Sequence, residues 1–232
     1  MSNHSNEAKQ AYSVEHRYVS IALLRRGYGV LRKAPGLENL QHAKEALQSN
    51  PGPSSLQLHE IFLSIDATID AFCICTAVEC AIKAFLVDQK LVVHSISKAN
   101  DLKLKTLKQR QKTRPVTQFE LLSAGGFPTT ATERIIDLVD VQTISLSTML
   151  GSRDYYEMAG LSDGLAELLK KTSDRRNIET HYFSVWLDQA LSEIIDTYSK
   201  VQEYFDSCVV GKHNELVEQS GYPASWKIAQ AS

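Results

Sequence analysis

The chain has 232 residues, a formal net charge of −2 and 43% hydrophobic residues. This composition suits one soluble domain with a substantial core, and no apolar run reaches the ~18 residues that a membrane-spanning helix needs. The polar stretch 1–7 has no signal-peptide core, so we expect a cytoplasmic protein that makes no membrane contact. The four cysteines and seven histidines show neither zinc-ligand nor disulfide spacing. We therefore expect no metal and no cofactor, and cysteines that pack as small apolar residues.

The first third of the chain is predicted to be helical. Apolar residues at three- and four-residue steps predict a long helix over residues 7–33, which Pro35-Gly36 ends. A short helix is expected over 39–49, and a second long helix over 58–89. The second half of that long helix is apolar almost all round, which is typical of a helix buried between others.

Three polar residues interrupt this apolar half. Thr76, Glu79 and Lys83 recur at steps of three and four, so they lie on one line of the helix. One interpretation is a solvent-exposed edge, where a Glu–Lys pair contributes only about 0.2–0.5 kcal/mol. The other is a polar stripe that faces a functional helix across a cleft. The sequence pattern leaves both open.

Residues 90–128 are predicted to connect two helices, and they carry a cluster of positive charge. Such a cluster either contacts a nucleic-acid backbone or forms a solvated connector. Asp101 is the only acid between residues 98 and 114, so we expect some of the basic side chains to face solvent or a polyanion. The basic residues are Lys98 and six candidate RNA-binding residues, Lys103, Lys105, Lys108, Arg110, Lys112 and Arg114.

The remaining chain is again predicted to be helical. Apolar periodicity predicts a helix over 130–150, a short helix over 161–171 and a long helix over 174–208, with Asp174 as the N-cap. The fold expected for residues 1–210 is thus an all-α, up-and-down bundle of about five to seven helices. Residues 211–232 are a tail that either folds back on the domain or holds a partner.

The last long helix opens on Arg-Arg-Asn-Ile-Glu-Thr-His, residues 175–181. Arginine clamps phosphate with two parallel hydrogen bonds, and histidine transfers protons near neutral pH. Asn177 and His181 lie one turn apart on one face. Arg176 reaches them from the first turn, where free backbone amides also favour an anion. Arg175 satisfies the spacing to His181 as well, so the choice of arginine stays open.

An alanine-rich helix at 77–86, followed by a later helix that opens on Arg-Asn-x-x-x-His, resembles the HEPN superfamily. Arg176, Asn177 and His181 match its signature of Arg, four to six residues and His, often with Asn after the Arg. The resemblance implies a helical bundle that forms a homodimer, with both motifs lining one cleft. It also implies metal-independent endoribonuclease activity in a toxin or antiviral-defence setting. In some members a glutamate of the earlier helix joins the site, and Glu79 is the candidate here.

In the reaction that this resemblance implies, the 2′-OH of RNA attacks the adjacent phosphorus and leaves a 2′,3′-cyclic phosphate. His181 would transfer protons and Arg176 would stabilise the growing negative charge. Asn177 would orient the phosphate or the imidazole, and Glu79 would hold the histidine tautomer or act as a second base.

Two other functions fit the same residues. One is a non-catalytic helical module whose Arg–His pair is structural or binds a nucleotide or protein, and the other is a regulatory or antitoxin-like subunit that docks through residues 211–232.

Overall fold

The computed structural model describes residues 16–34, 45, 53–97, 101–182 and 188–229, and within these ranges only the backbone is described for 53–68, 175–182 and 188–192. The described part is mostly helical, with about nine helices and a small two-stranded sheet. The expected all-α class therefore holds for most of this part but misses the sheet. None of the helices in these ranges is long and apolar enough to cross a membrane.

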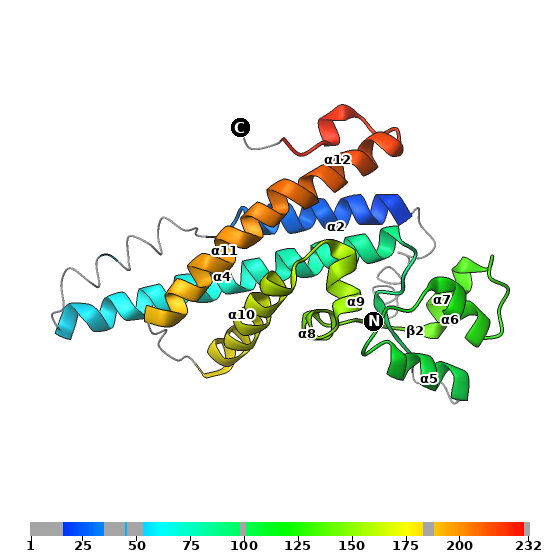
Figure 1. Cartoon of the computed structure of the whole chain (residues 1–232), viewed down its shortest axis with the longest axis horizontal. Helices are drawn as coiled ribbons and strands as arrows, with labels where there is room; N and C mark the ends of the chain where they lie inside the picture. The colour runs from blue at the N-terminus through cyan, green and yellow to red at the C-terminus, as the bar shows by residue number, and fades with distance from the viewer. Residues whose placement is uncertain (1–15, 35–44, 46–52, 98–100, 183–187, 230–232) are drawn as a thin grey trace, which may run out of the picture.

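The longest helix is α4 (Pro53–Asp88), and α2 (His16–Leu31) runs antiparallel beside it (Figure 1). The second half of α4 is buried as the sequence predicts, and residues such as Ile74 and Ile82 have no solvent-accessible surface. The start of the helix predicted over 7–33 lies outside the described residues, as does the short helix predicted over 39–49 except for residue 45.

Gly27 allows α2 to approach α4 closely. A Cβ atom at this position would lie 2.8 Å from the carbonyl oxygen of Ala77 and 3.3 Å from the Cβ of Cys80. We expect Gly27→Val to lower the free energy of unfolding by about 1–3 kcal/mol, because the two helices must separate. Gly29→Ala is the matched control, since no atom lies within 4 Å of its added Cβ and alanine favours a helix by about 0.5–1 kcal/mol. Urea unfolding measures both, and equal effects would contradict a tight contact at Gly27.

The helix that carries the Arg–His motif begins earlier than the sequence predicts. α10 spans Asp163–Tyr182, so the helix predicted over 161–171 and the start of the helix predicted over 174–208 form one element. No proline interrupts this stretch, and the Thr172 hydroxyl donates to a backbone carbonyl of the preceding turn at 3.0 Å. Asp174 is therefore a residue of the helix interior, and its prediction as an N-cap is wrong.

The predicted helix 174–208 is also divided at its centre. After residues 183–187, which lie outside the described part, α11 (Asp188–Tyr204) continues through a π-helical segment (Phe205–Val209) into α12 (Val210–Gln219). Figure 1 shows these three in line, crossing α4 and running to α2. The predicted tail therefore starts inside a helix.

The chain folds back on α12 after this helix ends. The backbone amide of Ile228 donates to the side-chain oxygen of Asn214 at 2.9 Å. The rings of Tyr222 and Trp226 stack with their centroids 4.8 Å apart. Of the two roles predicted for the tail, the described residues show the fold-back.

The long helix predicted over 130–150 is wrong. This stretch contains two short helices, α7 (Ile135–Leu138) and α8 (Leu146–Leu150), on either side of strand β2 (Val139–Thr143). Strand β2 pairs antiparallel with β1 (His94–Ile96). The β-branched residues of β2 favour an extended strand once a partner is present. That partner lies far earlier in the chain, so helical periodicity alone could not indicate it.

The segment predicted as a connector, 90–128, forms β1 and two capped helices. The Asp101 carboxylate caps α5 (Leu102–Arg110) by accepting the Lys103 amide at 2.6 Å. Thr117 and its capping-box partner Glu120 cap α6 (Gln118–Ala124). The remaining short helices are η2 (Thr132–Arg134), α9 (Arg153–Tyr156), η3 (Glu157–Ala159) and η5 (Ala224–Trp226).

Candidate functional site

The Arg–His motif lies in the second half of α10, where only the backbone is described. The α-helix keeps positions 177 and 181 one turn apart on one face. The amides around Arg176 are not at a helix start, because α10 begins at Asp163 and helix-interior amides bond to the preceding turn. The prediction of an anion site at free amides is therefore wrong. The choice between Arg175 and Arg176 depends on side chains outside the described part and stays open.

Glu79 and Lys83 form a partly buried pair on α4. Lys83 is only 9% exposed, and its ammonium donates to the Glu79 carboxylate and, at 2.7 Å, to the Thr143 hydroxyl of β2. A solvent-exposed edge would leave the lysine in water. The polar stripe of α4 instead faces the β2 side of the molecule, so the interpretation as a solvated edge is wrong.

A polar pocket of about 480 Å³ lies where α4, β2, α8 and α10 meet. Glu79 supplies its carboxylate and the surrounding wall is rich in hydroxyls. The lining residues are Glu79, Gln142, Thr143, Ser145, Leu146, Ser147 and Ser173. A carboxylate among hydroxyl groups can accept hydrogen bonds from a bound ligand and take part in proton transfer.

Ser173 connects this pocket with the Arg–His motif. It belongs to α10, is 3% exposed, and lines the same pocket as Glu79. Positions 176 and 177 follow Ser173 by one helical turn, and position 181 follows by about two turns. Around the axis of α10, positions 176 and 177 lie about 60° and about 40° from Ser173, so they are the motif positions nearest the pocket wall. Position 181 lies about 80° from Ser173 and about 12 Å farther along the axis.

Three residues of the basic cluster pair with acids outside it. Arg110 lies 2.5 Å and Arg114 4.0 Å from the carboxylate of Glu120, and Lys108 lies 3.5 Å from that of Asp140. Burial raises the pKa of the Glu120 carboxyl, but hydrogen bonds from the Thr117 amide and from Arg110 outweigh this and bring the pKa below its usual range. These three side chains therefore find acidic partners outside the segment 98–114, and only the rest of the cluster can face solvent or a polyanion.

The other described lysines of the cluster behave as the sequence predicts. Lys103, Lys105 and Lys112 are exposed, and none has an ion-pair partner among the residues that the structure describes. Lys98 lies outside the described part. The basic cluster is thus partly neutralised and partly free to meet a polyanion.

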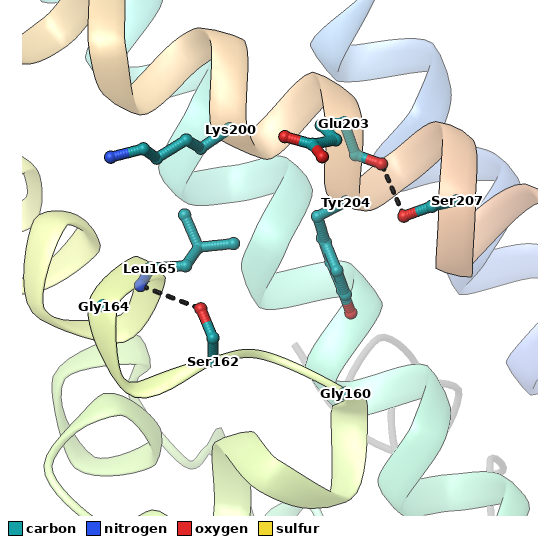
Figure 2. A pocket seen from close by; sticks show the side chains of 8 residues that line it. All are labelled: Gly160, Ser162, Gly164, Leu165, Lys200, Glu203, Tyr204 and Ser207. Atoms are coloured by element: carbon teal, nitrogen blue, oxygen red, sulfur yellow. Dashed lines mark hydrogen bonds between the residues drawn. The ribbon is translucent and has the colours of Figure 1, made fainter.

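A second pocket, of about 430 Å³, lies between the start of α10 and α11 (Figure 2). Three of its polar side chains are already bonded within the fold. The Tyr204 hydroxyl donates to the Ala159 carbonyl at 2.8 Å, and Ser207 donates to the Glu203 carbonyl at 2.6 Å. Lys200 pairs with an aspartate of its own helix at 2.9 Å. The Tyr204 bond joins α11 to η3, and the other two bonds stay within α11 and the π-helical segment after it. We assign the pocket no chemistry.

The cysteines are free thiols, and three of them are buried in α4. Burial raises the pKa of Cys73 and of Cys80, so both stay protonated at neutral pH and pack as apolar groups. Within the described ranges, no three His, Cys, Asp or Glu side chains gather as metal ligands do.

Comparisons with family models, with curated proteins and with solved structures found no match to this chain. The HEPN resemblance rests on the motif and the helix order of the sequence, and it stays a prediction.

Sequence reasoning missed most of the pocket wall. Thr143, Ser145 and Ser147 fall in the stretch that was predicted to be one helix, so their position beside Glu79 was not expected. For Ser145 the sequence offers one indication, because serine is a common N-cap residue. In the structure Ser145 caps α8, and its side-chain oxygen accepts the backbone amide of Thr148 at 3.2 Å. Ser173 carries no signal beyond its place one turn before the motif.

Proposed function

We propose that this protein is a metal-independent endoribonuclease of the HEPN type, with its site between α4 and the second half of α10. One observation carries the proposal. Glu79 and Ser173 line one pocket, and the motif positions follow Ser173 by one and two turns of the same helix. A residue of α4 and a residue of the helix that carries the motif, far apart along the chain, therefore line one pocket, and this supports the proposal.

The proposed reaction needs two proton transfers and one charge-stabilising group. The 2′-oxygen of the substrate forms a bond to phosphorus, the bond to the 5′-oxygen breaks, and a 2′,3′-cyclic phosphate results. A base accepts the 2′-hydroxyl proton, and an acid protonates the departing 5′-oxygen. His181 fills one of these roles and Glu79 the other, or Glu79 orients the imidazole. Arg176 stabilises the charge on the phosphoryl oxygens, and Asn177 orients the phosphate.

Lys83 fixes the orientation of the Glu79 carboxylate for this role. Its ammonium holds the Glu79 carboxylate from one side and the Thr143 hydroxyl from the other. A carboxylate fixed by a nearly buried partner keeps one orientation toward the pocket, which general acid–base catalysis requires. The ion pair thus serves the geometry of the proposed site as well as the packing of β2 on α4.

Exposed apolar residues on the same stripe support a homodimer. Ile69 and Phe72 are 43% and 56% exposed and precede Thr76 and Glu79 at steps of three and four. A second copy that covered them would come to lie beside the Glu79 pocket. This is the arrangement that a cleft shared by two motifs needs.

We expect Phe72→Asp to convert the proposed dimer to a monomer, because a buried unpaired carboxylate opposes association. Light scattering at micromolar concentration measures the mass. Phe119→Asp is the matched control, since Phe119 is 63% exposed on α6, away from this stripe, and should leave the dimer intact. A wild-type monomer, or a dimer that persists in Phe72→Asp, would contradict this interface.

The function is tested by incubating the purified full chain with single-stranded RNA in excess chelator. We expect cleavage by the wild-type protein and a large loss in Glu79→Gln, which keeps the size of the side chain and removes its charge. Glu203→Gln changes an exposed glutamate of α11 and should cleave normally. A non-catalytic interaction module or an antitoxin-like subunit would cleave no RNA in any of these variants.

A further inference from the structure

Another polar pocket, of about 250 Å³, borders the connection between β2 and α8, beside the Glu79 pocket. It is bounded by α5 and the turn that follows it, by β1, and by the start of α8. Its polar wall includes Ser95, Lys108, Lys112, Gln142, Ser145 and Thr148. Two ammonium groups and several hydroxyls therefore border one small space, and all of them can donate hydrogen bonds.

The floor of this pocket is built by Gln111, which is 5% exposed. Its carboxamide oxygen accepts the Ile96 amide at 3.1 Å, and its nitrogen donates to the His94 carbonyl at 2.8 Å. These bonds tie the end of α5 to strand β1. The two lysines are thus presented from a fixed backbone, while the side chain of Gln111 is fully occupied with structure.

The two lysines are bound less firmly within the protein than Gln111 is. Lys108 lies 3.5 Å from Asp140, a loose and partly exposed pair, and Lys112 has no ion-pair partner in the described ranges. The Ser145 hydroxyl lies 2.9 Å from that of Thr148 and can turn toward a ligand. An anion that entered the pocket would meet positive charge and hydroxyl donors together, which is the environment that binds phosphate.

The basic residues of α5 divide into two sides, and only one side faces this pocket. Lys105 and Lys108 are three residues apart on α5 and so share a side, and Lys112, in the turn after the helix, lines the same pocket as Lys108. Lys103 and Arg110 lie on the opposite side, toward α6, where Glu120 neutralises Arg110. The charge available to a polyanion is therefore concentrated on the pocket side.

The two pockets are neighbours with a common wall. Gln142, Thr143 and Ser145 line both the 250 Å³ pocket and the Glu79 pocket. A nucleic-acid strand that crossed this wall would place one backbone phosphate in each of the two pockets. A single-stranded ribonucleic acid has this repeating geometry.

We propose that the pocket between α5 and the β2–α8 connection binds a backbone phosphate of single-stranded RNA, next to the nucleotide held in the Glu79 pocket. Lys112 and Lys108 supply the charge, and the hydroxyls of Ser145 and Thr148 supply further donors. This inference rests on the proposed function for its substrate, and it defines where the strand enters the site.

The test compares Lys112→Gln with Lys200→Gln, which changes an exposed lysine of α11 that lines neither of these two pockets. Both changes are made in the full chain that also carries His181→Ala, so that binding is measured without cleavage. The affinity for a short single-stranded RNA is followed by fluorescence anisotropy over a range of salt concentrations. We expect Lys112→Gln to weaken binding about 3–10-fold at low salt and to reduce the salt slope by about 0.7, the value for one lost phosphate contact. Lys200→Gln should change neither quantity.

If both substitutions lowered the RNA affinity equally, the proposed phosphate site would be contradicted. Such a result would indicate a general electrostatic attraction and no specific contact in this pocket. Unchanged binding in Lys112→Gln would overturn it as well. The proposed function fails separately, through absence of cleavage by the wild-type protein. If the wild-type protein does not cleave but Lys112→Gln alone loses affinity, the phosphate site stands and the ribonuclease assignment falls.

Discussion

Replacement of His181 with alanine is expected to slow RNA cleavage by a factor of about 10²–10⁴, because general acid–base catalysis contributes an effect of this size. The melting temperature and the helical circular dichroism should change little, since the sequence places His181 on a polar stripe of its helix and alanine favours a helix. A loss of several kcal/mol of stability in His181→Ala would instead identify a structural histidine and would contradict the proposed role.

The two adjacent arginines provide a matched comparison for the same assay. Arg175 and Arg176 have the same chemistry and differ by one helix position, about 100° around the axis. If Arg176 stabilises the charge on phosphate, Arg176→Ala should lose most of the activity while Arg175→Ala keeps it. The reverse result would transfer the role to Arg175, and equal retention of activity in both would remove arginine from the mechanism.

The second large effect is expected at Lys83. Lys83→Met should lower the free energy of unfolding by about 2 kcal/mol, since Glu79 and Thr143 both lose a charged hydrogen-bond donor in a largely buried place. Cleavage should fall as well, because the Glu79 carboxylate is no longer held in one orientation. Urea unfolding and the cleavage assay measure the two effects separately.

Lys200→Met is the control for this change. Lys200 also pairs with an acid four residues away on its own helix, Asp196, but both partners are about half exposed. Such a surface pair contributes about 0.2–0.5 kcal/mol, so the control should be almost neutral. If Lys83→Met is as mild as Lys200→Met, the Glu79–Lys83 pair is not an organising part of the site.

Sequence patterns predict an element correctly when all its sides have the same surroundings. The prediction fails when residues far away in the chain decide the structure. The buried half of α4 is apolar on every side, so no partner needs to be known to predict a buried helix. The stretch from Val139 to Thr143 offers β-branched residues and apolar periodicity together, and only the pairing with β1 decides for a strand. The start of α10 was missed for a related reason, because Asp174 looks like a cap until the helical bonds around it are known.

The candidate site shows the same limit. The stripe of Thr76, Glu79 and Lys83 could be read from helical spacing, but its direction could not, because Lys83 is buried by Thr143 of a later strand. The acids that neutralise part of the basic cluster, Glu120 and Asp140, both lie beyond residue 114 and reach it only through the fold. Lys112 remains free for the opposite reason, since no described acid comes near enough to pair with it.

The most direct test of the account is the chemistry of the RNA ends that the wild-type protein leaves in the presence of excess chelator. The purified full chain is incubated with a short single-stranded RNA, and the product masses are determined. The account predicts fragments that end in a 2′,3′-cyclic phosphate, paired with fragments that begin with a 5′-hydroxyl, and no such fragments from His181→Ala. Intact RNA, or 5′-phosphate products that disappear when chelator is added, would contradict a metal-independent ribonuclease site between α4 and α10.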